Sequence, residues 1–188
     1  MQRRCSWMEA HKMKTLALSL MVAGAMTLTG CSNVVSLNPF VTTEQAVMDP
    51  ALLGTWISSD GKDIYSIRQD GSGYTIRYLT DSSEVYQVKA RLMTAGDVKI
   101  LDVTAANEDP FQLAVHTGMR VWTDGDTLRF AILQTDWLKE QALRQLSTAP
   151  ISDRMLITSP GDAVGAFLAK AASDAKATDE AEVLHRVQ

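Results

Sequence analysis

The sequence predicts a mainly β fold: an antiparallel meander that curls into a barrel or a sandwich and carries two accessory α-helices. Three observations support it: several short runs alternate apolar with polar residues, Gly/Asp turn signals separate those runs, and two later segments have helical spacing. The chain has 188 residues, 46% hydrophobic and 21% charged. That composition is typical of one folded domain and excludes a disordered or multi-pass membrane protein.

The alternating runs indicate half-buried strands, because a strand with one buried face has a two-residue period. The predicted strands are Tyr74–Tyr78, Tyr86–Leu92, Phe111–Val121, Leu128–Ile132 and Met155–Thr158. Turn signals between the runs favour tight hairpins, because Gly and Asp tolerate a positive φ. These signals are Asp60-Gly61, Asp70-Gly71-Ser72-Gly73, Ala95-Gly96-Asp97 and Asp124-Gly125-Asp126.

Two segments have the spacing of amphipathic helices, near 136–147 and 160–172. We expect Asp136 to cap the first helix, whose apolar face comprises Leu138, Ala142, Leu143 and Leu146. The second helix follows Ser159-Pro160-Gly161-Asp162, which combines a capping serine, a first-turn proline and a carboxylate. It is expected to pack across the sheet or to close one end of a barrel.

Alternation fails at a few strand positions, where apolar residues fall on the expected outer face. These residues are Leu101, Val103, Ala131 and Leu133. An apolar outer face favours helix packing or contact with a partner protein at that place.

The N-terminal region has the pattern of a secretory signal. Basic residues precede an apolar run, Leu16–Leu28, which is interrupted only by Ser, Thr and Gly. The run is shorter than the roughly 20 residues that a membrane-spanning helix needs. We therefore interpret residues 1–30 as a signal peptide and not as a permanent transmembrane helix.

The run ends in Leu28-Thr29-Gly30-Cys31, which resembles the Leu-x-Gly-Cys lipobox of bacterial lipoproteins. The resemblance implies cleavage between Gly30 and Cys31 and acylation of the Cys31 thiol, so that acyl chains hold the protein on a membrane. In that class, Asp after the cysteine favours retention in the inner membrane. Ser32 stands there in this chain, which implies the outer membrane, with the domain facing the periplasm.

Beyond the signal peptide, the chain is acidic. Four of the 18 Lys and Arg and one of the 22 Asp and Glu lie in residues 1–30, so residues 31–188 carry a net charge of −7. This charge argues against nucleic acid as a partner and against electrostatic adhesion to anionic lipid. Cys5 and Cys31 are the only cysteines, which excludes a disulfide, a cysteine zinc site and a thiol nucleophile in the mature domain.

Composition predicts the domain organisation. We expect residues 31–50 to form a lipid-anchored tether, residues 51–172 to form the barrel or sandwich domain with both helices, and residues 173–188 to form a frayed tail. No cofactor is expected, since the chain has no Gly-rich phosphate loop followed by a helix and a lysine. Its acidic turns supply too few oxygens for a calcium loop.

Gly54-Thr55-Trp56 resembles the Gly-x-Trp motif that opens the first strand of lipocalins and related calycin barrels. The resemblance implies that Trp56 packs inside the base of an eight-stranded barrel, under an arginine from a late strand. We expect Arg154 to be that arginine. Most of the chain beyond the signal is also similar to small bacterial lipoproteins of unknown function, a similarity that transfers no residue roles.

Four aromatic residues are expected to point into the barrel: Trp56, Tyr74, Tyr78 and Tyr86. They line a ligand cavity if the barrel is hollow, or they fill a solid core. An eight-stranded interior is narrow enough for side chains to fill it, which favours the solid core.

Histidines limit the chemistry available to the domain. Only His116 and His185 lie beyond residue 31, which excludes a three-histidine metal site. His116 falls out of phase with the apolar face of its strand, so we expect it on the surface. A hydrolase is the alternative in which Asp102 or Asp136 lies within hydrogen-bond reach of His116.

Together, these patterns predict an outer-membrane lipoprotein with a non-catalytic binding or accessory role in the cell envelope. Its expected partner is a small apolar ligand inside a lipocalin-like barrel or another envelope protein.

Overall fold

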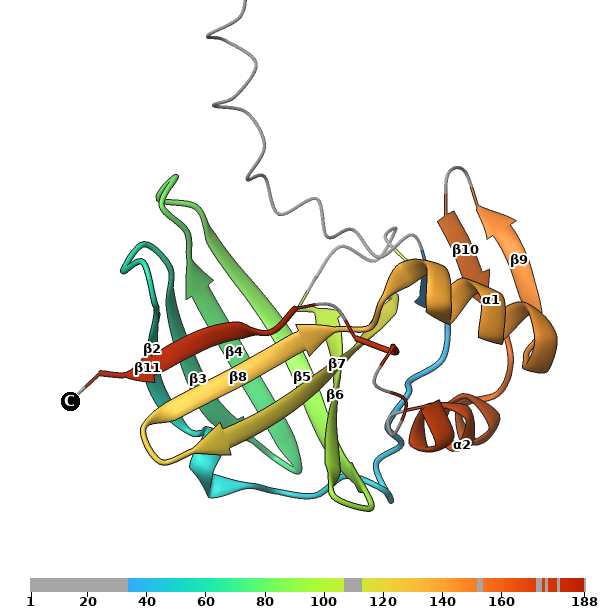
Figure 1. The fold of residues 1–188 in the computed structure, drawn as a ribbon, viewed down its shortest axis with the longest axis horizontal. Coiled ribbons are helices and arrows are strands. Elements are labelled where there is room, and N and C mark those ends of the chain that lie inside the picture. Colours follow the sequence, from blue (N-terminus) through green and yellow to red (C-terminus); the bar gives the residue numbers. More distant parts are fainter. Residues whose placement is uncertain are drawn as a thin grey trace, which may run out of the picture. The chain divides into compact units, whose positions relative to one another are not determined.

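Eight antiparallel strands close into a barrel in the computed structural model of the chain (Figure 1). It describes residues 34–106, 113–151, 154–171, 174, 176–178 and 180–187. The barrel strands are β2 (Gly54–Ser58), β3 (Ile64–Asp70), β4 (Gly73–Leu79), β5 (Val85–Ala95), β6 (Val98–Ala105), β7 (His116–Asp124), β8 (Thr127–Ile132) and β11 (Glu182–Arg186). The barrel closes because β6 pairs with β7, and β11 pairs with both β8 and β2. The predicted fold class is confirmed.

The β2–β3, β3–β4, β5–β6 and β7–β8 hairpins turn where the Gly/Asp signals predict, and the β4–β5 hairpin turns at residues 80–84 without such a signal. At the β3–β4 and β7–β8 turns, Gly71 and Gly125 have φ of +59° and +57°, a conformation that glycine adopts without a steric penalty. A side chain at either position would strain the turn. These short connections join strands that are neighbours along the chain, which produces the meander.

Helices and short strands pack on one side of the barrel (Figure 1). They are β1 (Val34–Ser36), α1 (Thr135–Gln145), β9 (Thr148–Ile151), β10 (Arg154–Ile157) and α2 (Gly161–Ala171), and a 3-10 turn, η1 (Pro50–Leu52), precedes β2. The predicted helices are present. Gln134, and not Asp136, caps α1 by accepting a hydrogen bond from the Trp137 backbone N–H. Leu143 is exposed and does not belong to the packed face.

The protein has two apolar cores. One fills the barrel, and its buried members include Leu52, Trp56, Tyr74, Leu92, Leu101, Val121, Leu128 and Leu184. The other lies between the outer face of the barrel and the helices, and it contains Met93, Ile100, Leu133, Leu138, Phe167 and Leu168. Leu133 therefore packs against the helices as its apolar outer position predicts, whereas Leu101 and Val103 belong to the barrel interior.

The prediction of a tether through residue 50 is wrong from Val34 onward. Strand β1 pairs in parallel with β10, and the side chains of Phe40 and Val41 are fully buried in the second core. A partner strand more than a hundred residues away stabilises this segment. Composition alone therefore cannot distinguish it from a linker.

The prediction of a frayed tail at 173–188 is also wrong. Residues 182–186 form β11, which is hydrogen-bonded on both sides and places Leu184 in the barrel core. The Ala-rich and charged residues before the strand conceal its short alternation. In contrast, strand β7 is shorter than predicted, since it begins at His116 and Leu113 is exposed. Phe111 lies outside the described residues.

Candidate functional site

An arginine and a tryptophan close one end of the barrel. The side chain of Trp56 is fully buried, and the Arg186 guanidinium carbon lies 4.1 Å from the centroid of its ring. Arg186 donates from Nη1 to the Leu53 carbonyl at 2.8 Å and from Nη2 to the Ala51 carbonyl at 2.9 Å. The Trp56 indole N–H donates to the Leu52 carbonyl at 2.9 Å. Arg186 thus joins the last barrel strand to the turn that precedes the first.

The prediction that Arg154 covers Trp56 is wrong, because Arg154 begins the outlying strand β10. The late-strand arginine that the calycin resemblance implies is Arg186, in the segment interpreted as a frayed tail. Gly54 is part of the same arrangement. It has φ of +134°, and a Cβ atom there would lie 2.6 Å from Arg186 Nη1, so only glycine fits beneath the guanidinium.

Tyr74 completes the closed end and lines no ligand cavity there. Its ring is buried, and its hydroxyl accepts a hydrogen bond from the Asp49 backbone N–H at 2.7 Å. Together with Trp56, it belongs to the solid core expected of a narrow barrel. The four sequence-predicted aromatic residues therefore divide into two pairs by burial: Trp56 and Tyr74 are buried, whereas Tyr78 and Tyr86 are partly accessible.

At the other end, inward-facing aromatic side chains are partly accessible to solvent. Tyr65, Tyr78 and Tyr86 occupy paired positions on β3, β4 and β5, and their rings stack with centroids 5.6 Å and 5.0 Å apart. Phe130 on β8 reaches Tyr65 across the interior with a centroid distance of 5.9 Å. Tyr86 is 42% exposed, Tyr78 and Phe130 are half-buried, and Tyr65 is buried. We call these four residues the aromatic wall.

A carboxyl group lies beside the aromatic wall. Glu182 Oε1 accepts a hydrogen bond from the Tyr65 hydroxyl at 3.3 Å. Burial raises the pKa of Glu182, and the nearby Asp63 and Asp60 carboxylates raise it further against the opposing effect of the Tyr65 hydrogen bond. Burial and the Glu182 charge likewise raise the pKa of Tyr65. Within the described ranges, no lysine or arginine forms an ion pair with Glu182.

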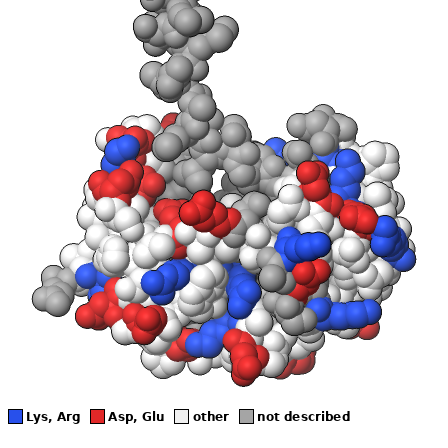
Figure 2. All heavy atoms as spheres, in the orientation of Figure 1, with Lys and Arg blue, Asp and Glu red and all other residues white. Residues whose placement is uncertain are grey.

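The sequence analysis missed Tyr65, Phe130 and Glu182 as site residues. A signal existed for Tyr65, because Tyr65-Ser66-Ile67-Arg68 alternates like the runs beside it. None existed for Glu182, since its position depends on β11 closing the barrel. On the face of the molecule in Figure 2, acidic and basic side chains are interspersed, and neither sign covers a large continuous area.

The structure brings His116 and Asp102 together on the outer face of the barrel. His116 Nδ1 lies 3.0 Å from Asp102 Oδ1, and the two side chains are 13% and 2% exposed. The expectation of a surface position for His116 is therefore wrong. The second Asp102 oxygen accepts from the Val41 backbone N–H at 3.5 Å. Asp136 lies in the first turn of α1 and is exposed.

The contact between His116 and Asp102 has a structural role, and we call this pair the clip. A catalytic histidine needs a nucleophile or water at its second nitrogen. Among the residues that the structure describes, no hydroxyl is hydrogen-bonded to His116 Nε2. Asp102 instead links β6 and β7 to the segment around Val41, so the pair fastens the N-terminal segment to the barrel.

We expect Asp102→Ala to lower the free energy of unfolding by about 1–3 kcal/mol, because it leaves the buried His116 nitrogen and the Val41 N–H without their acceptor. Asp102→Asn retains one carbonyl oxygen and is expected to cost less. Urea denaturation of both variants measures the difference. Equal stability of Asp102→Ala and the wild type would contradict the clip.

Other candidate chemistry is sparse. His185, on β11, is exposed, with Nε2 at 3.4 Å from the Ser59 hydroxyl. No group of three or more His, Cys, Asp or Glu side chains within the described residues is arranged to hold a metal ion. Gly30 and Cys31 lie outside the described residues.

Comparisons with family models, curated proteins and solved structures find no match to this chain. In the part of the chain that the structure describes, no helix has the length and apolar character needed to cross a membrane.

Proposed function

We propose that this protein is a non-catalytic binding module whose barrel takes up a small ligand with a flat apolar body and a basic nitrogen. The aromatic wall is the single observation that carries the proposal. Inward-facing rings that stay partly accessible in an otherwise filled barrel offer a surface for an apolar guest.

Two features support the proposal that the ligand has a flat apolar body. The stacked tyrosines present ring faces and edges along one side of the interior, and Phe130 faces them from β8. Aromatic pairs of this geometry gain about 0.5–1.5 kcal/mol beyond the burial of their area. Val88, Val103 and Met119 add half-buried apolar surface to the same core.

The Glu182 carboxyl group supports the proposal that the ligand carries a basic nitrogen. It is half-buried, and it lies near the Tyr65 hydroxyl and the Asp63 and Asp60 carboxylates. A half-buried carboxylate without a cationic partner is costly. A ligand ammonium group would supply that partner, and it would also gain from nearby tyrosine faces.

Three anthracene probes with the same ring system test the ligand chemistry on the full chain. They are 9-(aminomethyl)anthracene, 9-(hydroxymethyl)anthracene and anthracene-9-carboxylate, and fluorescence titration measures their binding. We expect the amine to bind roughly tenfold more tightly than the alcohol, consistent with a cation–π or charge-assisted contact of about 1–2 kcal/mol. The carboxylate is expected to bind least. Affinity for the amine is expected to fall as the pH decreases through the raised pKa of Glu182, since protonation removes the negative charge.

Variants separate the two parts of the site. Tyr86→Ser is expected to weaken all three probes, whereas Glu182→Gln is expected to weaken only the amine. Tyr74→Phe is the matched control, because Tyr74 lies buried at the closed end. Absence of binding by every probe would overturn the binding function. Equal binding of the amine and the alcohol would overturn only the basic nitrogen.

We propose that the module acts from the outer membrane, held by acyl chains on Cys31. The support is the Leu28-Thr29-Gly30-Cys31 motif at the end of the apolar run and the serine that follows it. Two or three acyl chains on one residue give stable anchoring, whereas one chain binds reversibly. The mass of the N-terminal peptide from membrane extracts tests this, and an unmodified Cys31 would contradict it.

A further inference from the structure

The outer face of β3, β4 and β5 has an ordered arrangement of side chains. Because the inward positions of these strands belong to the barrel core, the alternate positions face outward. The strand register sets nine of them in three rows: Ile64–Leu79–Val85, Ser66–Arg77–Gln87 and Arg68–Thr75–Lys89. We call these nine residues the β3–β5 face.

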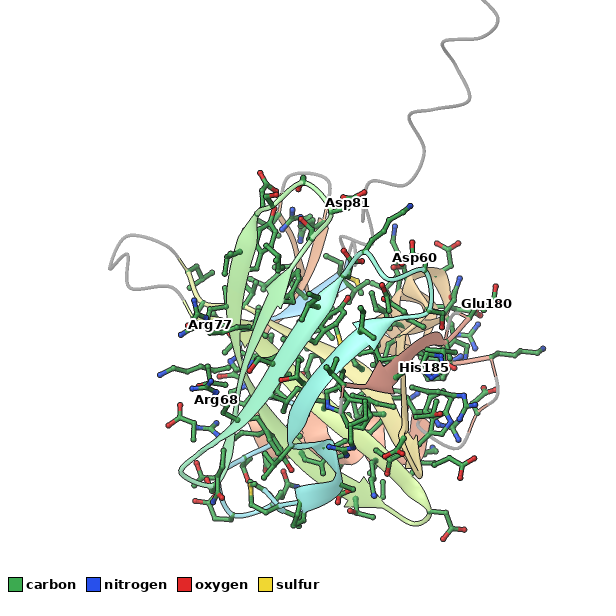
Figure 3. All side chains as sticks on the ribbon, turned by 90° about the vertical axis from the view of Figure 1, so that its left-hand side faces the viewer. Asp60, Arg68, Arg77, Asp81, Glu180 and His185 are labelled. Atoms are coloured by element: carbon green, nitrogen blue, oxygen red, sulfur yellow. The ribbon has the colours of Figure 1, made fainter. Side chains whose placement is uncertain are left out.

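The β3–β5 face is basic in an otherwise acidic protein. Arg68, Arg77 and Lys89 are exposed, and the nine positions include no Asp or Glu; one carboxylate, that of Asp70 at the end of β3, borders them and accepts a hydrogen bond from Thr75. Figure 3 shows Arg68 and Arg77 extending from neighbouring strands on the same side of the barrel. In the register, Arg77 is diagonal to both Arg68 and Lys89, a separation of about 7–8 Å. No ion pair within the described residues neutralises these three cations.

An exposed apolar row borders the cations. Ile64, Leu79 and Val85 are directly paired across the three strands and are 39%, 37% and 59% exposed. Single exposed apolar residues need no explanation, but three in one row form a continuous strip. The β3–β5 face therefore combines an apolar strip with three adjacent positive charges.

We propose that the β3–β5 face docks onto the surface of an anionic phospholipid bilayer. Charge complementarity supports this occupant, because the lipid phosphates match the three cations. The apolar strip matches the boundary between headgroups and acyl chains, which lies beside those phosphates. The net negative charge of the protein opposes binding to an anionic bilayer. Salt screens charges beyond about 8–10 Å, however, so the local composition of the face decides the interaction.

Vesicle co-sedimentation of the full chain tests the proposal. The readout is the ratio of partition into phosphatidylcholine vesicles with 30% phosphatidylglycerol to partition into pure phosphatidylcholine vesicles. The apolar run at 16–28 and the basic residues before it are common to all variants, so comparison of the variants with the wild type cancels their contribution. We expect Arg68→Gln, Arg77→Gln and Lys89→Gln combined to lower this ratio roughly 100-fold, from about fivefold for each cation.

The matched control removes three exposed lysines outside the face: Lys62, Lys139 and Lys176, each replaced by Gln. It changes the net charge equally and is expected to retain most of the preference for anionic vesicles. A Leu79→Ser, Val85→Ser variant is expected to weaken binding while the preference stays dependent on salt. An equal loss in the two triple variants would show that net charge sets the preference, and would overturn the proposal. No preference in the wild type would overturn it as well.

Discussion

Removal of residues 181–188 is expected to abolish the cooperative unfolding transition of the protein. The deletion takes away β11, which is hydrogen-bonded to β8 and β2. It therefore opens the barrel and leaves two unpaired strand edges, a known route to aggregation. It also removes Leu184 from the core and Arg186 from Trp56. The combined loss exceeds about 5 kcal/mol, which is the lower range of a domain's whole stability.

Far-UV and near-UV circular dichroism during urea titration measure this effect. Removal of Gln188 alone is the control, because it retains β11 and the Val187 N–H that donates to the Thr55 carbonyl at 2.9 Å. We expect the control to unfold like the wild type. A sharp transition at the wild-type midpoint in the longer deletion would show that the barrel does not need its last strand.

Local chemistry explains which parts of the fold the sequence predicts. The β2–β3, β3–β4, β5–β6 and β7–β8 hairpins connect neighbouring strands through turns whose Gly and Asp residues have their own conformational preferences. The alternation of β4, β5 and β7 then assigns their buried faces without knowledge of their partners, whereas in β6 it misassigns Leu101 and Val103, which lie in the barrel interior. The same local signals place α1 and α2 within a residue or two of their observed bounds.

Long-range pairing explains what the sequence does not predict. Strand β1 pairs with β10, and β11 inserts between β8 and β2; neither arrangement has a turn signal that links its partners. The missed site residues have the same origin. Glu182 meets Tyr65, and Arg186 meets Trp56, only after β11 closes the barrel. The clip between His116 and Asp102 likewise depends on the pairing of β6 with β7.

Trp56→Ala is expected to lower the free energy of unfolding by about 3–5 kcal/mol, the usual cost of removing a large buried aromatic side chain. The Trp56 side chain is fully buried, so its loss leaves a cavity at the closed end of the barrel. The Arg186 guanidinium also loses the ring beneath it. Urea denaturation, with the barrel fold checked by circular dichroism, measures the change.

Trp122→Ala is the matched control for this substitution, because Trp122 is half-buried and pairs with an arginine on the outer face of β7. The Arg120 guanidinium carbon lies 5.4 Å from the centroid of the Trp122 ring. Such an accessible cation–π contact contributes about 0.5–1 kcal/mol, so the control is expected to lose far less stability. Arg186→Lys retains the charge but not the two-pronged donation to Leu53 and Ala51, and should fall between them. Equal losses of unfolding free energy in the two tryptophan variants would show that the complete burial of Trp56 adds no stability beyond that of the half-buried Trp122.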